Sequence, residues 1–188
     1  SYSNIESHVS FVYFDDICFS EISKFSYEEN IKCRDKLLTR SEFNNSFLDA
    51  TDIIISAKWT ETSYNDVILL ADYLKDISKA KIHISGSVMF ANLQTLHRKI
   101  PNIDNKKNTA QIIYKYIRYD RLNTSRKLED LVLKDGNYNW IKRTDFFCDF
   151  TLKECYLFNE SGQPLIWDNA HLTVHAYRPF SKYLLDRL

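Results

Sequence analysis

The chain has 188 residues with 25 basic and 25 acidic side chains, so its formal net charge at neutral pH is zero. Without a basic excess it lacks the electrostatic footprint of a nucleic-acid-binding protein. Its longest apolar runs, such as Val67–Ala71, are far too short to cross a bilayer. The length fits one domain, and 12 Tyr and 12 Phe predict a core and grooves rich in aromatic rings. No signal-peptide pattern opens at Ser1, so we expect a mature form or a fragment of a longer protein.

Five segments of the first half carry a secondary-structure pattern. The predicted strands are His8–Asp15, Asp52–Ala57 and Lys81–Gly86, and the predicted helices are Ser41–Leu48 and Tyr64–Ala80. The continuous apolar run in Asp52–Ala57 is typical of a strand covered on both faces, as in a parallel sheet.

The second half continues the alternation of helices and strands. The predicted helices are Asp104–Tyr119, Ser125–Leu133 and Thr173–Leu188, and the predicted strand is Asn139–Phe147. The pair Asp135-Gly136 is expected to end the second of these helices. Strands that alternate with helices from residue 50 onward predict an α/β fold, a three-layer αβα sandwich with a mainly parallel sheet.

The four cysteines form two local pairs, Cys18 with Cys33 and Cys148 with Cys155. No pair has the C-x-x-C spacing of zinc or thioredoxin sites. From spacing alone two interpretations stay open, namely two disulfides in an oxidising compartment or four buried thiols.

One polar pair near the C-terminus suggests chemistry. Asp168 stands three residues before His171, and such an Asp can hold an imidazole in the tautomer that a hydrolytic triad needs. Two alternatives stay open. Asp168 could cap the closing helix, or Asp168, His171 and His175 could form a metal site. His83 lies inside a predicted strand and is expected to be a core histidine.

Four stretches, taken in chain order, carry a resemblance to a known family. They are Cys18 with Cys33, "DIIISAKW" (Asp52–Trp59) followed by Tyr64, "ISGSVMF" (Ile84–Phe90), and the tail Phe146–Thr173. The tail has two close cysteines, a Gly-polar-Pro-Leu step and D-x-x-H-L-[ST]. With these features the chain resembles the SGNH-hydrolase domain that bacteria fuse behind acyltransferase-3 membrane proteins, the O-acetylases of surface glycans. The resemblance covers nearly the whole chain from residue 8 onward.

The resemblance implies a fold of the SGNH-hydrolase, flavodoxin-like type and a Ser-His-Asp triad. In that triad His171 would be the base and Asp168 would orient it. Residues 1–188 would form a single SGNH-like domain, the C-terminal fragment of a longer membrane protein.

The resemblance also favours two disulfides, Cys18–Cys33 and Cys148–Cys155. It implies a periplasmic location, tethered to the inner membrane. No bound cofactor is expected, because a membrane acyltransferase domain in the parent protein would deliver the acetyl donor. The implied partner is a glycan, lipopolysaccharide or another surface polysaccharide, and not a nucleic acid.

The nucleophile departs from the family pattern. The family's serine lies in a Gly-Asp-Ser block on its first strand, but Gly86, Gly136 and Gly162 are the chain's three glycines, and none is followed by Asp-Ser. The first strand-like segment matches the family's second strand. We therefore expect the nucleophile, and with it the family's first strand, upstream of residue 1. Ser1 is the alternative candidate for the nucleophile, if a Gly-Asp directly precedes it.

The substrate groove and the oxyanion donors are predicted by position only. Trp59 and Tyr64 are candidate sugar-binding residues, as is Trp167, and packing in the core stays open as the alternative for these rings. Ser56, Trp59 or a backbone amide near Gly86 could hold the oxyanion.

Three functions follow. The leading hypothesis is O-acyl (acetyl) transfer to, or ester hydrolysis on, a bacterial surface glycan. The alternative is a non-catalytic glycan-binding or scaffolding SGNH-like domain that has lost its serine. A weaker third is a metal-dependent hydrolase built on the Asp and His cluster described above.

Overall fold

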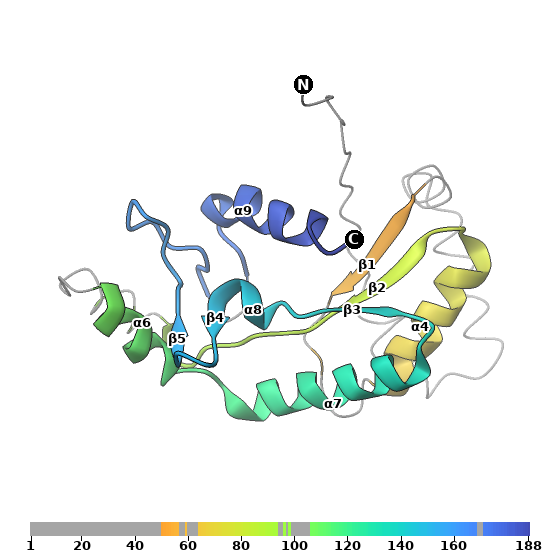
Figure 1. Ribbon diagram of the computed structural model, residues 1–188, viewed down its shortest axis with the longest axis horizontal. Helices are drawn as coiled ribbons and strands as arrows, with labels where there is room; N and C mark the ends of the chain where they lie inside the picture. The colour runs from red at the N-terminus through yellow and green to blue at the C-terminus, as the bar shows by residue number, and fades with distance from the viewer. Residues whose placement is uncertain are drawn as a thin grey trace, which may run out of the picture. The chain divides into compact units, whose positions relative to one another are not determined.

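The computed structural model describes residues 50–56, 59, 64–93, 96, 98, 106–168 and 171–188 (Figure 1). Several predictions lie outside these residues: the strand His8–Asp15, the helix Ser41–Leu48, and the pair Cys18 and Cys33.

The described elements alternate along the chain (Figure 1). In order they are β1 (Asp52–Ser56), α4 (Tyr64–Ile77), β2 (Lys81–Ser85), α6 (Lys106–Tyr114), α7 (Tyr119–Asp135), β3 (Asn139–Ile141), α8 (Thr144–Phe147), β4 (Cys148–Asp149), β5 (Glu154–Cys155) and α9 (Val174–Leu185).

β1, β2 and β3 form a parallel sheet in that strand order, flanked by helices. In the register of β2 and β3, His83 lies opposite Asn139 and Ser85 opposite Ile141. Four consecutive residues of β2, Ile82–Ser85, are buried, as expected for a strand covered on both faces. The predicted α/β class with a parallel sheet is therefore confirmed, and His83 is a core histidine as predicted.

Several element boundaries differ from prediction, through a local hydrogen bond at the end of α4 and through a contact distant in sequence at the end of α6. α4 ends at Ile77, not Ala80, where the amide and the hydroxyl of Ser78 both donate to the Leu74 carbonyl. α6 ends at Tyr114 because the chain then pairs with the segment after β2, through a bridge between Phe90 and Ile117.

α7 begins at Tyr119, six residues before the predicted start. Its first two turns are mostly polar, so they carry little of the apolar periodicity from which a helix is predicted. Its end is as predicted. Gly136 caps the helix with a positive φ of 72°, and its N–H donates to the Val132 carbonyl.

The predicted strand Asn139–Phe147 is correct only as far as Ile141. The chain then turns into the short helix α8, which carries Phe146 and Phe147 into aromatic clusters. The ring of Phe147 is fully buried and meets Phe90 edge to face, with ring centroids 6.4 Å apart. An aromatic pair reads as a strand in sequence, but here tertiary packing favours a helical turn.

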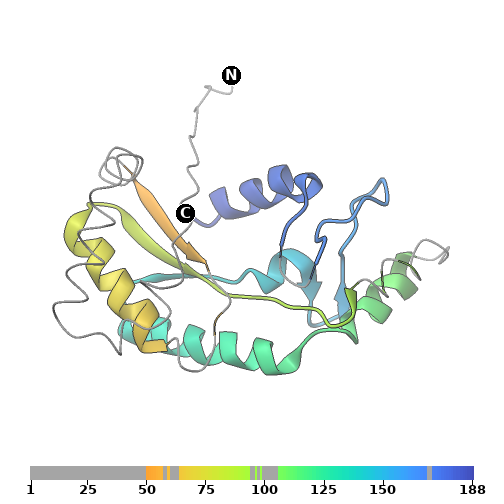
Figure 2. The same ribbon diagram turned by 180° about the vertical axis from the view of Figure 1, so that it is seen from behind.

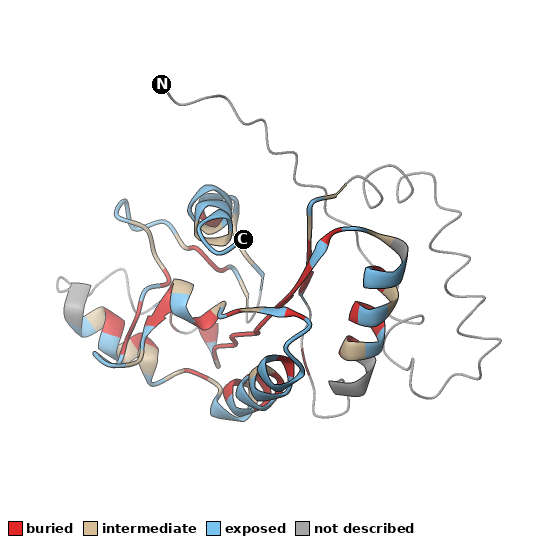
Figure 3. Cartoon of the chain, turned by 45° about the vertical axis from the view of Figure 1, so that its right-hand side comes forward, coloured by how far each residue is buried: buried red, intermediate tan, exposed pale blue. Residues whose placement is uncertain are grey.

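The chain forms two compact units. The first contains residues 1–53 and 65–81, and the second contains residues 54–64 and 82–188. In the first, α4 buries Val67, Leu70, Ala71 and Leu74 along one face, as its helical spacing predicts. The second has its own apolar core, and Figure 3 shows buried positions on β2, α7 and α8. The prediction of a single domain over residues 1–188 stays a prediction.

A disulfide joins Cys148 and Cys155 and confirms the second predicted pair. The two cysteines face each other in the antiparallel pair β4–β5, and both are buried. Asp149 closes the turn between these strands, because its Oδ1 accepts the amides of Thr151 and Leu152 at 2.8 and 2.9 Å. Closing so short a loop restricts the unfolded chain and is worth ~2–3 kcal/mol.

Candidate active site

The turn that carries the Asp-His pair is the tip of a small antiparallel hairpin. Ile166 pairs with Leu172 across it, and the Trp167 amide donates to the His171 carbonyl at 3.1 Å. Ile166 is fully buried in the core of the second unit. The buried side chain of Ile166, directly before Trp167, therefore anchors the exposed end of the hairpin.

Asp168 holds both the backbone and the side chain of His171. Its Oδ1 accepts the His171 amide at 2.8 Å, and its Oδ2 lies 2.5 Å from Nδ1 of the imidazole. With a carboxylate as acceptor, Nδ1 carries the proton and the unprotonated nitrogen is Nε2. The His171 side chain is 74% exposed and that of Asp168 39%. The predicted contact between the two is thus present, with the ring open to solvent.

The helix-cap alternative for Asp168 is wrong. α9 has its N-cap at Thr173, five residues later, and the Thr173 hydroxyl donates to the Pro164 carbonyl at 2.5 Å. Asp168 instead caps the turn before the helix, through the His171 amide. The side chain that could have capped α9 is therefore used to fix the imidazole.

The helix that follows His171 is attached to the carboxyl end of β3. The Tyr183 hydroxyl donates to the Lys142 carbonyl at 2.5 Å, and the rings of Phe146 and Phe180 meet edge to face at 5.0 Å. Both ribbon views show α9 beside α8 (Figures 1 and 2). The carboxyl end of a parallel sheet is where active sites of open α/β folds form.

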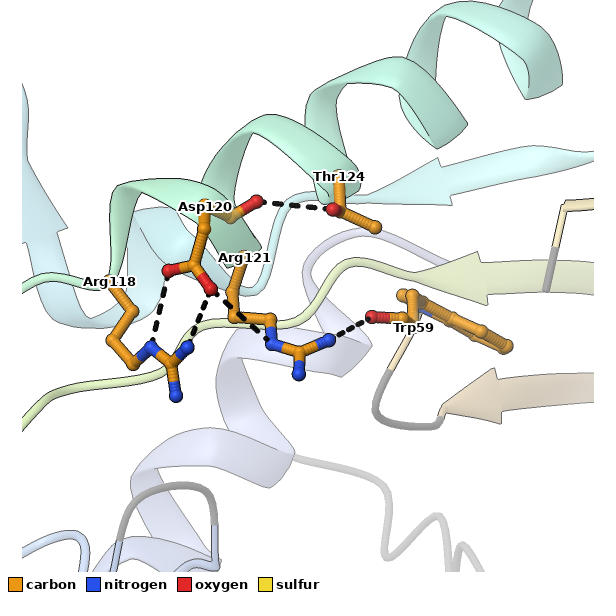
Figure 4. Close-up of polar contacts among 5 residues, drawn as sticks. All are labelled: Trp59, Arg118, Asp120, Arg121 and Thr124. Atoms are coloured by element: carbon orange, nitrogen blue, oxygen red, sulfur yellow. Dashed lines mark hydrogen bonds and ion pairs between the residues drawn. The ribbon is translucent and has the colours of Figure 1, made fainter. Parts of the chain in front are cut away.

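Trp59, predicted to line a sugar groove, lies in the core. Its side chain is 5% exposed, and its indole N–H donates to the carbonyl of Ser85, the last residue of β2, at 2.7 Å. Its own carbonyl accepts Nη1 of Arg121 at 3.4 Å (Figure 4). Trp59 therefore ties the loop after β1 to the end of β2 and the start of α7. Its substrate-binding role stays a prediction.

A cluster at the start of α7 positions Arg121 for this contact (Figure 4). The guanidinium of Arg118 donates twice to the Asp120 carboxylate, at 3.2 and 2.6 Å, and Arg121 Nε lies 3.8 Å from the same carboxylate. The hydrogen bond from Arg118 lowers the pKa of Asp120, and Asp120 in turn raises the pKa of Arg118. Sequence patterns did not single out Arg121, because its partner lies 62 residues away.

The backbone amides near the end of β2 that were predicted as oxyanion donors already form hydrogen bonds within the protein. The Gly86 amide donates to the Ile141 carbonyl at 2.9 Å, and the Ser87 amide to the Ser125 hydroxyl at 3.2 Å. The indole N–H of Trp59 already donates to the Ser85 carbonyl. Gly86 has a packing role instead, because a Cβ there would lie 2.8 Å from Ser125 Oγ and 2.9 Å from the Trp140 ring. Ser56 is exposed at the end of β1.

Tyr64 and the three residues of the metal alternative are the other predicted site residues. The backbone of Tyr64 begins α4, and its side chain lies outside what the structure describes. Within the described ranges no three His, Cys, Asp or Glu side chains are grouped to hold a metal ion, so the arrangement of Asp168, His171 and His175 gives the metal alternative no support. No helix in the described part is long and apolar enough to span a membrane.

A comparison with known families gives one match. The model of the family described as "SGNH domain (fused to AT3 domains)", where AT3 denotes acyltransferase-3, matches residues 7–186. No curated protein and no solved structure matches the chain.

Proposed function

The chain belongs to the SGNH domains of the type fused to AT3 domains, and from this premise we propose that it transfers or removes acetyl groups on a bacterial surface glycan. The family is one of esterases and O-acetyltransferases. The proposal adds the substrate and the residues, with His171 as the general base and Asp168 as the group that orients it.

The observation that carries the proposal is the double hold of Asp168 on His171. One carboxylate oxygen fixes the backbone at 2.8 Å and the other fixes the ring at 2.5 Å. The imidazole therefore needs no reorganisation before it accepts a proton at Nε2. A preset tautomer beside a carboxylate that stabilises the imidazolium is what the base of an acyl-transfer triad requires.

In the first half-reaction a serine Oγ attacks the acyl carbon while Nε2 of His171 takes the hydroxyl proton. The carbonyl electrons move onto oxygen, and the oxyanion collapses as the leaving oxygen takes the proton back from Nε2. In the second half-reaction a glycan hydroxyl, or water, gives its proton to Nε2 and attacks the acyl-serine. Serine then leaves with that proton. Asp168 stabilises the imidazolium in both halves.

The serine is expected from the family's Gly-Asp-Ser block, upstream of residue 1 or with Ser1 as its last residue. The acetyl group would come from an acyltransferase-3 domain in the parent protein, with no cofactor bound by this chain. The Cys148–Cys155 disulfide and the type of family support a periplasmic location, tethered to the inner membrane.

A second candidate is a glycan-binding or scaffolding domain without catalysis. It is favoured by one observation, that no glycine of the chain is followed by Asp-Ser. Such a domain would bind the glycan equally well with or without the imidazole of His171.

Matched histidine variants of the full-length protein test the proposal. His171→Ala should lower acetyl transfer to purified surface polysaccharide, or hydrolysis of p-nitrophenyl acetate, by ~10²–10⁴-fold, the usual contribution of a general base. His175→Ala is the control, because His175 is exposed one turn further along, on α9. Both variants should keep the parent's melting temperature. Equal activity in the two variants would favour the non-catalytic candidate.

A further inference from the structure

A cavity of about 590 Å³ lies beside the carboxyl ends of β2 and β3, entirely within the second unit. Its walls come from Gly86, from the face of α7 between Leu122 and Glu129, and from the stretch Trp140–Thr151 with Tyr156. Of the described residues of the neighbouring turn, Trp167, Asp168 and His171 do not line it. The volume falls within the range of small-molecule sites, roughly 300–1,000 Å³. The cavity is therefore a separate candidate binding site.

Aromatic rings and hydroxyl groups make up much of the cavity wall. The rings that are not fully buried are those of Trp140, Phe146, Phe150 and Tyr156. The hydroxyls come from Ser125, Thr144, Thr151 and Tyr156. Thr144 donates to Asp145 Oδ1 at 3.3 Å and Tyr156 to Glu154 Oε2 at 2.5 Å, so these two hydroxyls offer acceptor lone pairs to a ligand. Flat apolar surfaces beside such polar groups suit a ligand with apolar faces and many hydroxyls. That description fits a sugar ring.

The cavity wall carries two basic and three acidic side chains, a net charge of minus one with both signs present, which disfavours an ionic ligand. Lys142 Nζ is paired with Glu129 Oε1 at 2.8 Å, so these two charges offset each other. Arg126 remains, opposed by Asp145 and Asp149. An anion would meet the two carboxylates, and a cation would meet the guanidinium. An uncharged ligand meets neither penalty.

Arg126 is a fixed and available donor on this wall. Its guanidinium lies over the Phe150 ring, 5.6 Å from the centroid, which limits its freedom. Across the described ranges it takes part in no ion pair or hydrogen bond with another side chain. A planar group with several N–H donors, held beside an aromatic ring, can bind vicinal hydroxyls in a fixed orientation.

We propose that this cavity is a subsite for an uncharged saccharide unit, separate from the Asp168–His171 turn. The choice of a saccharide rests on the proposed function. A domain that modifies a polysaccharide binds it more tightly when it holds the polysaccharide at a second point. Arg126 donates to sugar hydroxyls, and the aromatic rings contact the sugar faces. The turn with Asp168 and His171 then acts on a different sugar residue of the same polysaccharide.

The test titrates the protein with three neutral probes, the methyl β-glycosides of glucose, galactose and N-acetylglucosamine, and with methyl β-glucuronide as the anionic comparison. Binding is followed by ¹H–¹⁵N NMR at the Trp140 indole and at the amides of Thr144 and Thr151. At least one neutral probe should give saturable shifts there that do not change with salt. Absence of such shifts for all three neutral probes, or binding of the glucuronide alone, overturns the proposal.

Two neighbouring positions on α7 supply the matched variants. Arg126→Ala should weaken binding of the neutral probe about tenfold, as for loss of a hydrogen bond from a charged donor. Lys127→Ala should leave it unchanged, because Lys127 is exposed and does not line the cavity. Equal affinities in the two variants overturn the proposal.

His171→Ala separates this proposal from the function. It should leave probe binding unchanged while it lowers activity by the ~10²–10⁴-fold expected for loss of the general base. Probe binding without any activity loss in His171→Ala would sink the proposed function and leave the subsite. Activity loss without binding at Trp140 would sink the subsite alone.

Discussion

Two tryptophans of the same predicted role lie in opposite surroundings. Trp59 is 5% exposed and donates its indole N–H to Ser85, whereas Trp167 is 65% exposed and directly precedes Asp168. Trp167 is held through its backbone, by the amide that donates to the His171 carbonyl. One ring is thus part of the structure at the end of the sheet, and the other is open to ligands beside the candidate base.

The contrast is between a region held by contacts distant in sequence and a turn held by local contacts. The region around Trp59 is secured by contacts distant in sequence, from β2 and from Arg121 on α7. The turn around Trp167 is secured by local contacts within the hairpin and by the buried anchor Ile166. Substitutions in the first region should therefore affect folding, and those in the second should affect chemistry.

The largest effect on stability is expected at Trp59. Trp59→Ala removes a buried ring and its hydrogen bond and should cost ~3–5 kcal/mol in the free energy of unfolding, measured in urea. Trp167→Ala should stay within ~0.5 kcal/mol of the parent, as usual for an exposed position. Trp59→Phe keeps a ring without the N–H and should fall between them. Similar losses of unfolding free energy in Trp59→Ala and Trp167→Ala would contradict the difference in surroundings described for the two rings.

Loss of the disulfide, like substitution of Trp59, should lower the free energy of unfolding. The double variant Cys148→Ser with Cys155→Ser should lose ~2–3 kcal/mol of unfolding free energy, by loop-closure entropy and the burial of both positions. Reduction of the parent with dithiothreitol should produce the same shift of the urea midpoint. Thiol titration of the denatured, unreduced protein should find neither cysteine reactive. Two reactive thiols at these positions would contradict the structure.

A smaller effect, on substrate binding alone, is expected at Trp167. Loss of one aromatic contact of about 1 kcal/mol should raise KM for the polysaccharide about fivefold in Trp167→Ala. KM for p-nitrophenyl acetate should not change, because this small ester has no sugar to stack on the ring. An unchanged KM for the polysaccharide would show that the exposed ring has no part in glycan binding.

The smallest effect concerns the Arg118–Asp120 pair that supports the Trp59 region. Because the pKa of Asp120 is lowered in the folded state, the pair stabilises at pH above the ordinary Asp value, and this stabilisation is lost as pH falls through the lowered pKa. The carboxyl carbon of Asp120 should titrate below an ordinary Asp by NMR. Arg118→Ala should return it to the ordinary range. The pair lies at the surface in contact with solvent, so little change in melting temperature is expected.

Features with a local cause could be predicted from the sequence. β1, β2 and α4 follow from apolar patterns over a few residues, and the end of α7 follows from Gly136. The Asp168–His171 contact follows from a spacing of three, and the Cys148–Cys155 bond from a spacing of seven. In each case the interacting groups lie within one turn or one hairpin.

Features with a distant cause could not be predicted. Trp59 is buried because Ser85 and Arg121 meet it, 26 and 62 residues away. α6 stops at Tyr114 because Ile117 pairs with Phe90. The amide of Gly86 is unavailable to an oxyanion because Ile141 of the neighbouring strand accepts it. No pattern within a short window of sequence contains these partners.

The most direct test of the central claim is the tautomer of His171. ¹⁵N NMR of the imidazole, at a pH where its shifts report a neutral ring, should place the proton on Nδ1 and leave Nε2 unprotonated, with Asp168 as the acceptor. In Asp168→Ala the ring should become a mixture of tautomers. A parent protein with the proton on Nε2, or a tautomer ratio that Asp168→Ala leaves unchanged, would contradict the assignment of Asp168 as the group that prepares His171 to act as a base.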